Sequence, residues 1–118
     1  MDLAPARNGD ALIVHPKGRI NHLNAVAFEE AMSPHVTACK TSGVKLLVDL
    51  SELEYVSSAG LRVFMLAAKK LIPGGGKMAV AAAQPVVREI LEISRFNLVF
   101  PLFGTVAEAL AAFAAPKV

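Results

Sequence analysis

The chain has 118 residues, a length typical of one domain, and 54% of them are hydrophobic. Twelve basic and ten acidic residues nearly cancel, and the absence of a Lys/Arg run and of Trp argues against nucleic-acid binding. One cysteine, Cys39, excludes an internal disulfide and fits a reducing compartment. We expect a cytoplasmic single domain over residues 1–118, with no signal peptide, no membrane insertion and no cofactor.

The first elements predicted along the chain are two short strands. Asn8-Gly9-Asp10 is typical of a hairpin turn, because Asn-Gly tolerates positive φ. Pro5 places the first arm at the edge of a sheet. The second arm covers residues 11–20, and Pro16 and Gly18 interrupt it.

A helix and a buried strand follow. Asn24 can cap a helix that runs to about Cys39, and Pro34 predicts a kink or an early break in that helix. The apolar residues at helical spacing on its inner face are Phe28, Ala31, Met32, Val36 and Cys39. Residues 44–50 form an almost continuous apolar run, which favours a central strand covered on both faces.

The next segment is predicted to be a loop through Tyr55 and then a helix. This helix starts near Ser58, runs to residue 71 or 72, and ends at the turn of residues 73–76, Pro-Gly-Gly-Gly. Residues 78–83 form the next strand.

The C-terminal part is predicted to contain a helix, a strand and a helix. Pro85 stands at a first helical position, and Asn97 is expected to close that helix. Residues 99–103 form the last strand. Thr105 and Glu108 have the spacing of a capping box, and the final helix has Val106, Ala109, Leu110 and Phe113 on its apolar face.

The predicted order of elements is β-β-α-β-α-β-α-β-α. Strands that alternate with helices imply right-handed crossovers. We therefore predict an α/β fold with a mostly parallel central sheet of about five strands and about four helices.

The junction between residues 49 and 62 is the strongest candidate site, because sites in α/β sheets collect at the carboxyl ends of strands. Ser58 lies at the predicted helix start, where unpaired N–H groups can hold a phosphate. From spacing alone, however, a serine here is more often a simple helix cap.

Three segments resemble the STAS family of anti-sigma factor antagonists: Asp49-Leu50-Ser51, Tyr55–Val63 with its Ser-x-Gly-Leu, and Gly18-Arg19-Ile20-Asn21. The resemblance covers nearly the whole chain. It implies a partner switch, in which the unphosphorylated antagonist binds a serine kinase that is also an anti-sigma factor. Phosphorylation then separates the two proteins, and a metal-dependent serine phosphatase resets the switch.

The resemblance places the phosphorylated serine two residues before Gly60, which is Ser58. The chain departs from the family pattern at Ser57, where an Asp is common, and at Ala59, where a second hydroxyl residue is common. Ser57 is therefore the second candidate for the phosphate acceptor. Asn21 occupies a position that is often acidic in the family.

A partner-binding face is predicted on the helix that follows Ser58. Leu66 lies among basic side chains at helical spacing, which indicates either a docking patch or a solvated face with a single Leu. Gly60 removes side-chain bulk, which we interpret as access for a kinase. The predicted partner-binding residues are Asn21, Gly60, Leu61, Arg62, Leu66 and Lys69, with Lys70 on the same face.

Other chemistry is not indicated. Residues 74–77, Gly-Gly-Gly-Lys, lack phosphate-loop spacing, and His35 with Cys39 supplies only two metal ligands. The nucleophile elbow of a serine hydrolase is missing, so we predict no enzyme. Two alternatives stay open: a STAS-like accessory subunit that docks on a membrane transporter ATPase, and a nucleotide-binding enzyme.

Overall fold

The structure is a computed structural model that describes residues 1–73 and 77–114. The strands are β1 (Ala6–Asn8), β2 (Ala11–Val14), β3 (Gly18–Ile20), β4 (Lys45–Asp49), β5 (Leu53–Val56), β6 (Met78–Ala81) and β7 (Leu102–Phe103). The helices are α1 (Ala25–Ser42), α2 (Ser58–Leu71), α3 (Pro85–Ile93) and α4 (Val106–Ala114), with a 3-10 turn η1 (Phe96–Leu98).

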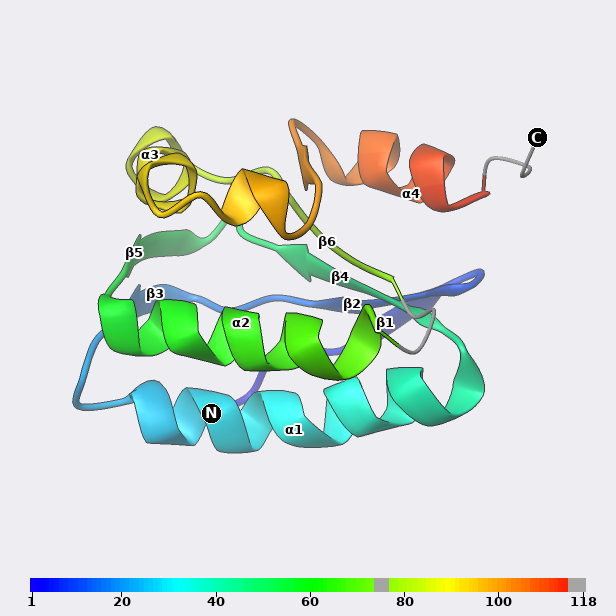
Figure 1. Ribbon diagram of the computed structural model, residues 1–118, viewed down its shortest axis with the longest axis horizontal. Coiled ribbons are helices and arrows are strands. Elements are labelled where there is room, and N and C mark those ends of the chain that lie inside the picture. Colours follow the sequence, from blue (N-terminus) through cyan, green and yellow to red (C-terminus); the bar gives the residue numbers. More distant parts are fainter. Residues whose placement is uncertain (74–76, 115–118) are drawn as a thin grey trace.

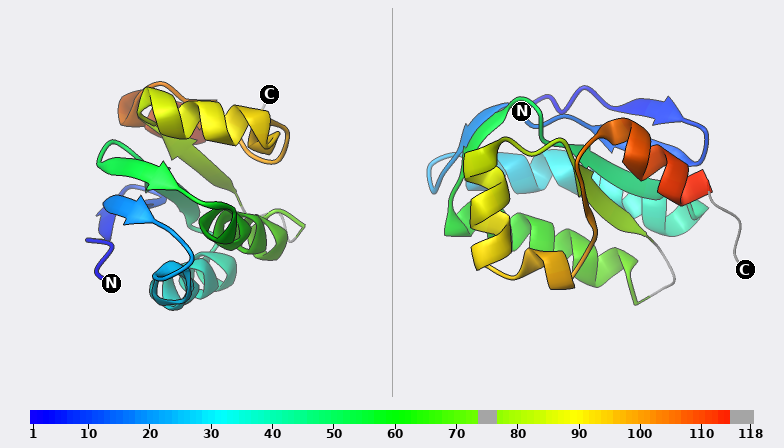
Figure 2. Two further views of the ribbon diagram at one scale, coloured as in Figure 1. Left: turned by 90° about the vertical axis from the view of Figure 1, so that its left-hand side faces the viewer. Right: turned by 90° about the horizontal axis from the view of Figure 1, so that it is seen from above.

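The central sheet has the strand order β1-β2-β4-β6-β7, in which β1 is antiparallel and the other pairs are parallel. Helices α1 and α2 cover one face, and α3 and α4 cover the other (Figure 1). This architecture confirms the predicted α/β fold with a mostly parallel five-stranded sheet and four helices. The left view of Figure 2 shows the resulting three layers stacked, and the right view looks down on α3 and α4 above the sheet.

Burial explains the position of β4 at the centre of the sheet. Leu46, Leu47 and Val48 are fully buried, as the apolar run predicts. The larger cluster of core side chains joins the sheet to α1 and α2, where Phe28 and Phe64 meet edge to face at 5.5 Å between ring centroids, and it also includes Val87 and Leu91 of α3. A smaller cluster joins the sheet to α4.

The predicted turns and helix starts are largely confirmed. Gly9 has φ +58 in the β1–β2 hairpin, and β1 is an edge strand. α3 begins at Pro85, and the Thr105 hydroxyl accepts the Glu108 N–H at 3.1 Å ahead of α4. The last predicted strand is shorter than expected, because pairing with β6 covers only Leu102 and Phe103.

The early break predicted at Pro34 and the end predicted for α3 at Asn97 are both wrong. α1 continues through Pro34 to Ser42, because Pro34 and Glu30 lie on the exposed side, where water can satisfy the carbonyl that the proline leaves unpaired. α3 ends at Ile93 and not at Asn97, because Arg95 takes a left-handed φ of +62 and starts η1. Asn24 precedes α1 as predicted, but its side chain makes no cap hydrogen bond to the helix.

The segment before α2 is also not the predicted loop. Leu53–Val56 forms β5, which pairs in parallel with β3 as a second, two-stranded sheet. This small sheet extends one end of the central sheet and brings the β3–α1 connection beside the start of α2 (Figure 1). The predicted turn at residues 74–76 lies outside the described residues.

Candidate functional site

The site is built on the first turn of α2. Ser57 is the N-cap, with extended backbone, and its hydroxyl accepts the Gly60 N–H at 3.4 Å. The Ser57 N–H donates to the Ile20 carbonyl at 2.8 Å, which ties this turn to the end of β3. The Ser57 carbonyl accepts the Leu61 N–H at 2.9 Å, so the fold uses all three polar groups of this half-buried residue.

Ser58 differs from its neighbour in each of these respects. It is the first residue of α2 and is exposed to solvent. Within residues 1–73 and 77–114, no hydrogen bond engages its hydroxyl. The Ser58 side chain can therefore enter another protein's active site without loss of a structural contact.

The electrostatics of this turn suit a phosphate. The first turn of α2 has no acidic residue, so the positive end of the helix dipole is uncompensated. Arg62 follows Ser58 by four residues and is exposed, which is the spacing for an ion pair along a helix. A phosphate on Ser58 would face free N–H groups and a guanidinium group.

Gly60 has a different role from the predicted one. It is buried, and a Cβ there would lie 2.6 Å from Val56 Cγ2 and 2.7 Å from Ile20 Cγ2. The missing side chain faces the core under the helix and not the solvent. The expectation that Gly60 opens the surface for a kinase is therefore wrong, and its place in the site is to let α2 start close to β3 and β5.

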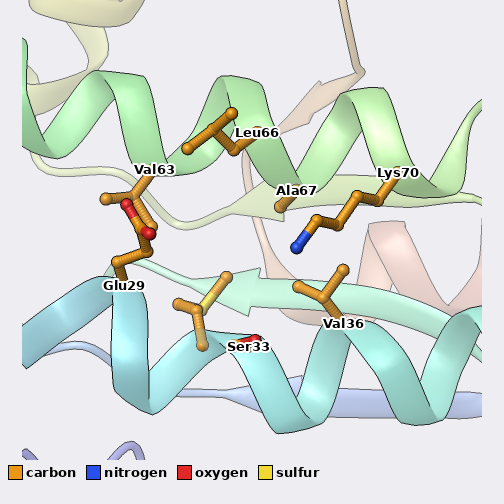
Figure 3. Close-up of a pocket in the computed structure, with 8 residues that line it drawn as sticks. Glu29, Ser33, Val36, Val63, Leu66, Ala67 and Lys70 are labelled. Carbon is orange, nitrogen blue, oxygen red and sulfur yellow. The ribbon is translucent and has the colours of Figure 1, made fainter.

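The predicted basic face of α2 is divided between two cavities. Leu66 and Lys70 line a groove of about 280 Å³ between α1 and α2, together with Glu29, Met32, Ser33, Val36, Val63 and Ala67. In Figure 3, Lys70 extends from α2 toward α1 and Glu29 extends from α1 toward α2. Lys69 instead borders a cavity of about 210 Å³ with Met65 and Ile72.

The apolar residues of this face are less exposed to solvent than expected. Leu66 is half-buried and belongs to the groove wall, and Leu61 is half-buried and packs against the core. Arg62, Lys69 and Lys70 are exposed. Of the predicted patch, the basic residues lie at the surface, whereas the leucines lie partly beneath it.

Asn21 lies at the same end of the molecule as Ser58, because the Ser57 N–H bonds to the preceding residue, Ile20. Its side-chain oxygen accepts the Leu23 N–H at 2.9 Å, and its own N–H donates to Asn24 Oδ1 at 2.8 Å. Asn21 therefore shapes the connection beside the site. Sequence reasoning missed two exposed apolar residues here, Leu23 in the connection and Val26 at the start of α1, although Val26 falls off the inward stripe of the helix.

The described residues offer no other chemistry. They contain no group of three or more His, Cys, Asp or Glu side chains that could hold a metal ion. Burial raises the pKa of the Cys39 thiol, with a smaller opposing effect of Arg7, so this thiol stays protonated near neutral pH. Within the same residues, no helix combines the length and the apolar character that crossing a membrane requires.

A model of the STAS domain matches residues 3–109. The chain belongs to the STAS domain family. This STAS domain is 37% identical over 102 residues to BtrV of Bordetella bronchiseptica, named as a candidate anti-sigma factor antagonist, and the match covers 86% of this chain and 85% of BtrV. It is 32% identical over 93 residues to the anti-sigma-F factor antagonist RsfB of Mycobacterium tuberculosis, with coverage of 79% and 73%.

Solved structures agree with this family. The STAS domain superposes on an anti-sigma factor antagonist from Mycobacterium paratuberculosis with a TM-score of 0.80 at 28% identity, over 92% of this chain and 89% of the other. The phosphorylated form of SpoIIAA from Bacillus has the same fold, with a TM-score of 0.66 at 13% identity over 92% and 96% of the two chains. The prediction that the chain is not an enzyme agrees with these relatives, which are named as antagonists and not as catalysts.

Proposed function

We propose that this STAS domain is an anti-sigma factor antagonist that binds a serine kinase/anti-sigma factor and is released when the kinase phosphorylates Ser58. The observation that carries the proposal is that two adjacent serines have different roles. Ser57 caps α2, while Ser58 is exposed and its hydroxyl makes no hydrogen bond within the described chain. Ser58 is thus the acceptor that a kinase can reach at no cost to the fold.

The charge of the phosphate explains how one modification can end binding without unfolding the domain. Phosphorylation adds about −1.5 to −2 charges and three acceptor oxygens. In the free domain these oxygens would meet the α2 N–H groups and Arg62. In a closed interface the same charge would lose water without a partner, which costs several kcal/mol and lowers affinity by about a hundredfold or more.

The partner surface of the proposal surrounds Ser58. It consists of Asn21 at the β3–α1 connection, Arg62 one turn along α2, and Leu66 and Lys70 in the groove. Lys69 contributes at the far end of α2. A metal-dependent serine phosphatase would reset the switch, and the exposed position of Ser58 leaves the phosphate open to hydrolysis.

The test uses the purified chain and the serine kinase/anti-sigma factor from the organism that makes it. After incubation with ATP, mass spectrometry is expected to find one phosphate on Ser58 and none on Ser58→Ala. Ser94→Ala is the matched control, because Ser94 is also exposed but follows α3. Calorimetry is expected to show a loss of affinity of at least about a hundredfold after phosphorylation.

Two results would overturn the proposal. Full labelling of Ser58→Ala, or equal affinity of the phosphorylated and unphosphorylated domains, would remove Ser58 as the switch. A chain that binds no such kinase but binds a membrane transporter ATPase would be an accessory subunit of that transporter.

A further inference from the structure

The connection between β3 and α1 presents two large apolar side chains to solvent beside Ser58. Leu23 is 82% exposed and Val26 is 69% exposed, both unusually high for such residues. The Ser57 N–H to Ile20 carbonyl bond places this connection directly against the first turn of α2. We call residues 21–26 the β3–α1 corner.

Hydrogen bonds hold the corner in one conformation. Asn24 donates from its side-chain amide to the Arg19 carbonyl at 2.8 Å and accepts the Asn21 N–H at 2.8 Å. Asn21 accepts the Leu23 N–H at 2.9 Å, and its carbonyl accepts the Ala25 N–H at 3.0 Å. Leu23 therefore lies on an ordered loop. A partner that buries Leu23 would lose little free energy to the conformational entropy of ordering this loop.

The corner also continues into the groove between α1 and α2. Val26 precedes Glu29 by three residues and Ser33 by seven, so the three lie along one stripe of α1. Glu29 and Ser33 line the groove opposite Leu66 and Lys70 (Figure 3). Val26 thus lies on the stripe of α1 that leads to the groove, with the acidic Glu29 one turn further along the helix.

We infer that Leu23 and Val26 form the apolar anchor by which the serine kinase/anti-sigma factor docks beside Ser58. The inference rests on the proposed function. It adds to the partner-binding surface two residues, Leu23 and Val26, that sequence reasoning did not select. We assign the anchor to the kinase because the corner is bonded to the start of α2, where the kinase must reach the Ser58 hydroxyl. An acidic side chain on the kinase would complement Arg62, and an apolar pocket would receive Leu23.

The anchor also accounts for the sensitivity of the complex to phosphate. Burial of Leu23 and Val26 against a partner would remove water at the corner, which the Ser57 N–H to Ile20 carbonyl bond joins to the start of α2. A charge placed at the edge of a dry contact costs more than one placed in a wet contact. The same anchor that strengthens docking therefore makes docking incompatible with phosphorylated Ser58.

The experiment compares Leu23→Ser with Leu98→Ser, in binding to the purified kinase and in the rate of Ser58 phosphorylation. Leu98 is 75% exposed and lies in η1, so it is a matched control outside the corner. We expect Leu23→Ser to lower affinity and kcat/KM at least tenfold, Leu98→Ser to leave both unchanged, and both variants to keep the wild-type Tm within about 2 °C.

The outcomes separate this inference from the proposed function. Wild-type affinity of Leu23→Ser would overturn the anchor, and if Ser58→Asp still abolished binding, the switch would stand without it. Equal losses in both leucine variants would show a general effect of surface hydrophobicity and overturn the anchor. Light scattering that finds a dimer of the wild type but a monomer of Leu23→Ser would assign the corner to a second copy of this chain and overturn it as well.

Discussion

Replacement of Gly60 by alanine tests how closely α2 is packed at the site. The new Cβ would lie 2.6 Å from Val56 Cγ2 and 2.7 Å from Ile20 Cγ2, well inside van der Waals contact. Both neighbours are branched, buried side chains in strands, so neither can turn away freely. The first turn of α2 or the β3–β5 sheet must then shift.

The expected magnitude follows from two opposing effects. Two contacts below 3.0 Å, both with branched core side chains, place the overpacking cost in the upper part of the usual range, at about 2–3 kcal/mol. Alanine in place of glycine in a helix returns up to about 1 kcal/mol. The net loss in the free energy of unfolding is about 1–2 kcal/mol, which for a domain of this size lowers Tm by roughly 3–10 °C.

Thermal and urea unfolding of Gly60→Ala measure this loss, and Gly104→Ala is the control. A Cβ at Gly104 meets only Glu108 carboxylate oxygens at 3.6 and 3.9 Å, an ordinary contact, so its stability should stay equal or rise slightly. Val56→Ala removes one of the two clashing methyl groups, so the double variant should lose less than the sum of the single losses. Strict additivity, or Gly60→Ala as stable as the wild type, would refute the packing argument.

Three further predictions, made with four variants, test other features of the fold. Ser57→Ala is expected to lower the free energy of unfolding by about 0.5–2 kcal/mol through loss of the α2 cap, while Ser58→Ala stays within about 0.5 kcal/mol in urea titration; equal losses would contradict the division of roles. Pro34→Ala should raise the free energy of unfolding by about 1–3 kcal/mol, because an exposed helix position regains its N–H bond, and a lower Tm would show that the ring is needed. Lys45→Met removes the bond from Lys45 Nζ to the Phe113 carbonyl at 2.8 Å, so amide exchange over 106–114 should accelerate about tenfold with α2 unchanged; unaltered exchange would rule out this anchor of α4.

The local elements of this domain were predictable wherever adjacent residues carry the signal. The Asn8-Gly9 turn, the buried run of β4 and the proline start of α3 each follow from backbone preference or apolar spacing within a few residues. The Ser-x-Gly-Leu segment, read with Asp49-Leu50-Ser51, also led to the family and to Ser58. These signals are local, and the tertiary contacts of these elements favour the same conformations.

β5 was missed because its partner is distant in the chain. Leu53–Val56 is a strand through pairing with Gly18–Ile20, and a run of four residues is too short for its Tyr and Val to predict a strand without that partner. Pro34 misled for a related reason, since a proline breaks a helix in a buried environment but is tolerated where the freed carbonyl meets water.

The site residues show the same difference between what local sequence predicts and what long-range contacts decide. The sequence predicted that a serine pair and a glycine start a helix, because those residue types are recognisable wherever they occur, but it did not show that the strand before this helix is β5 of the small sheet. The rotation of α2 on the sheet decided the rest: it turned Ser57 inward as the cap, left Ser58 in solvent and pointed the bare side of Gly60 at Ile20 and Val56. That rotation is set by contacts among α1, α2 and the β3–β5 pair, which join residues far apart in the chain and leave no mark in local spacing.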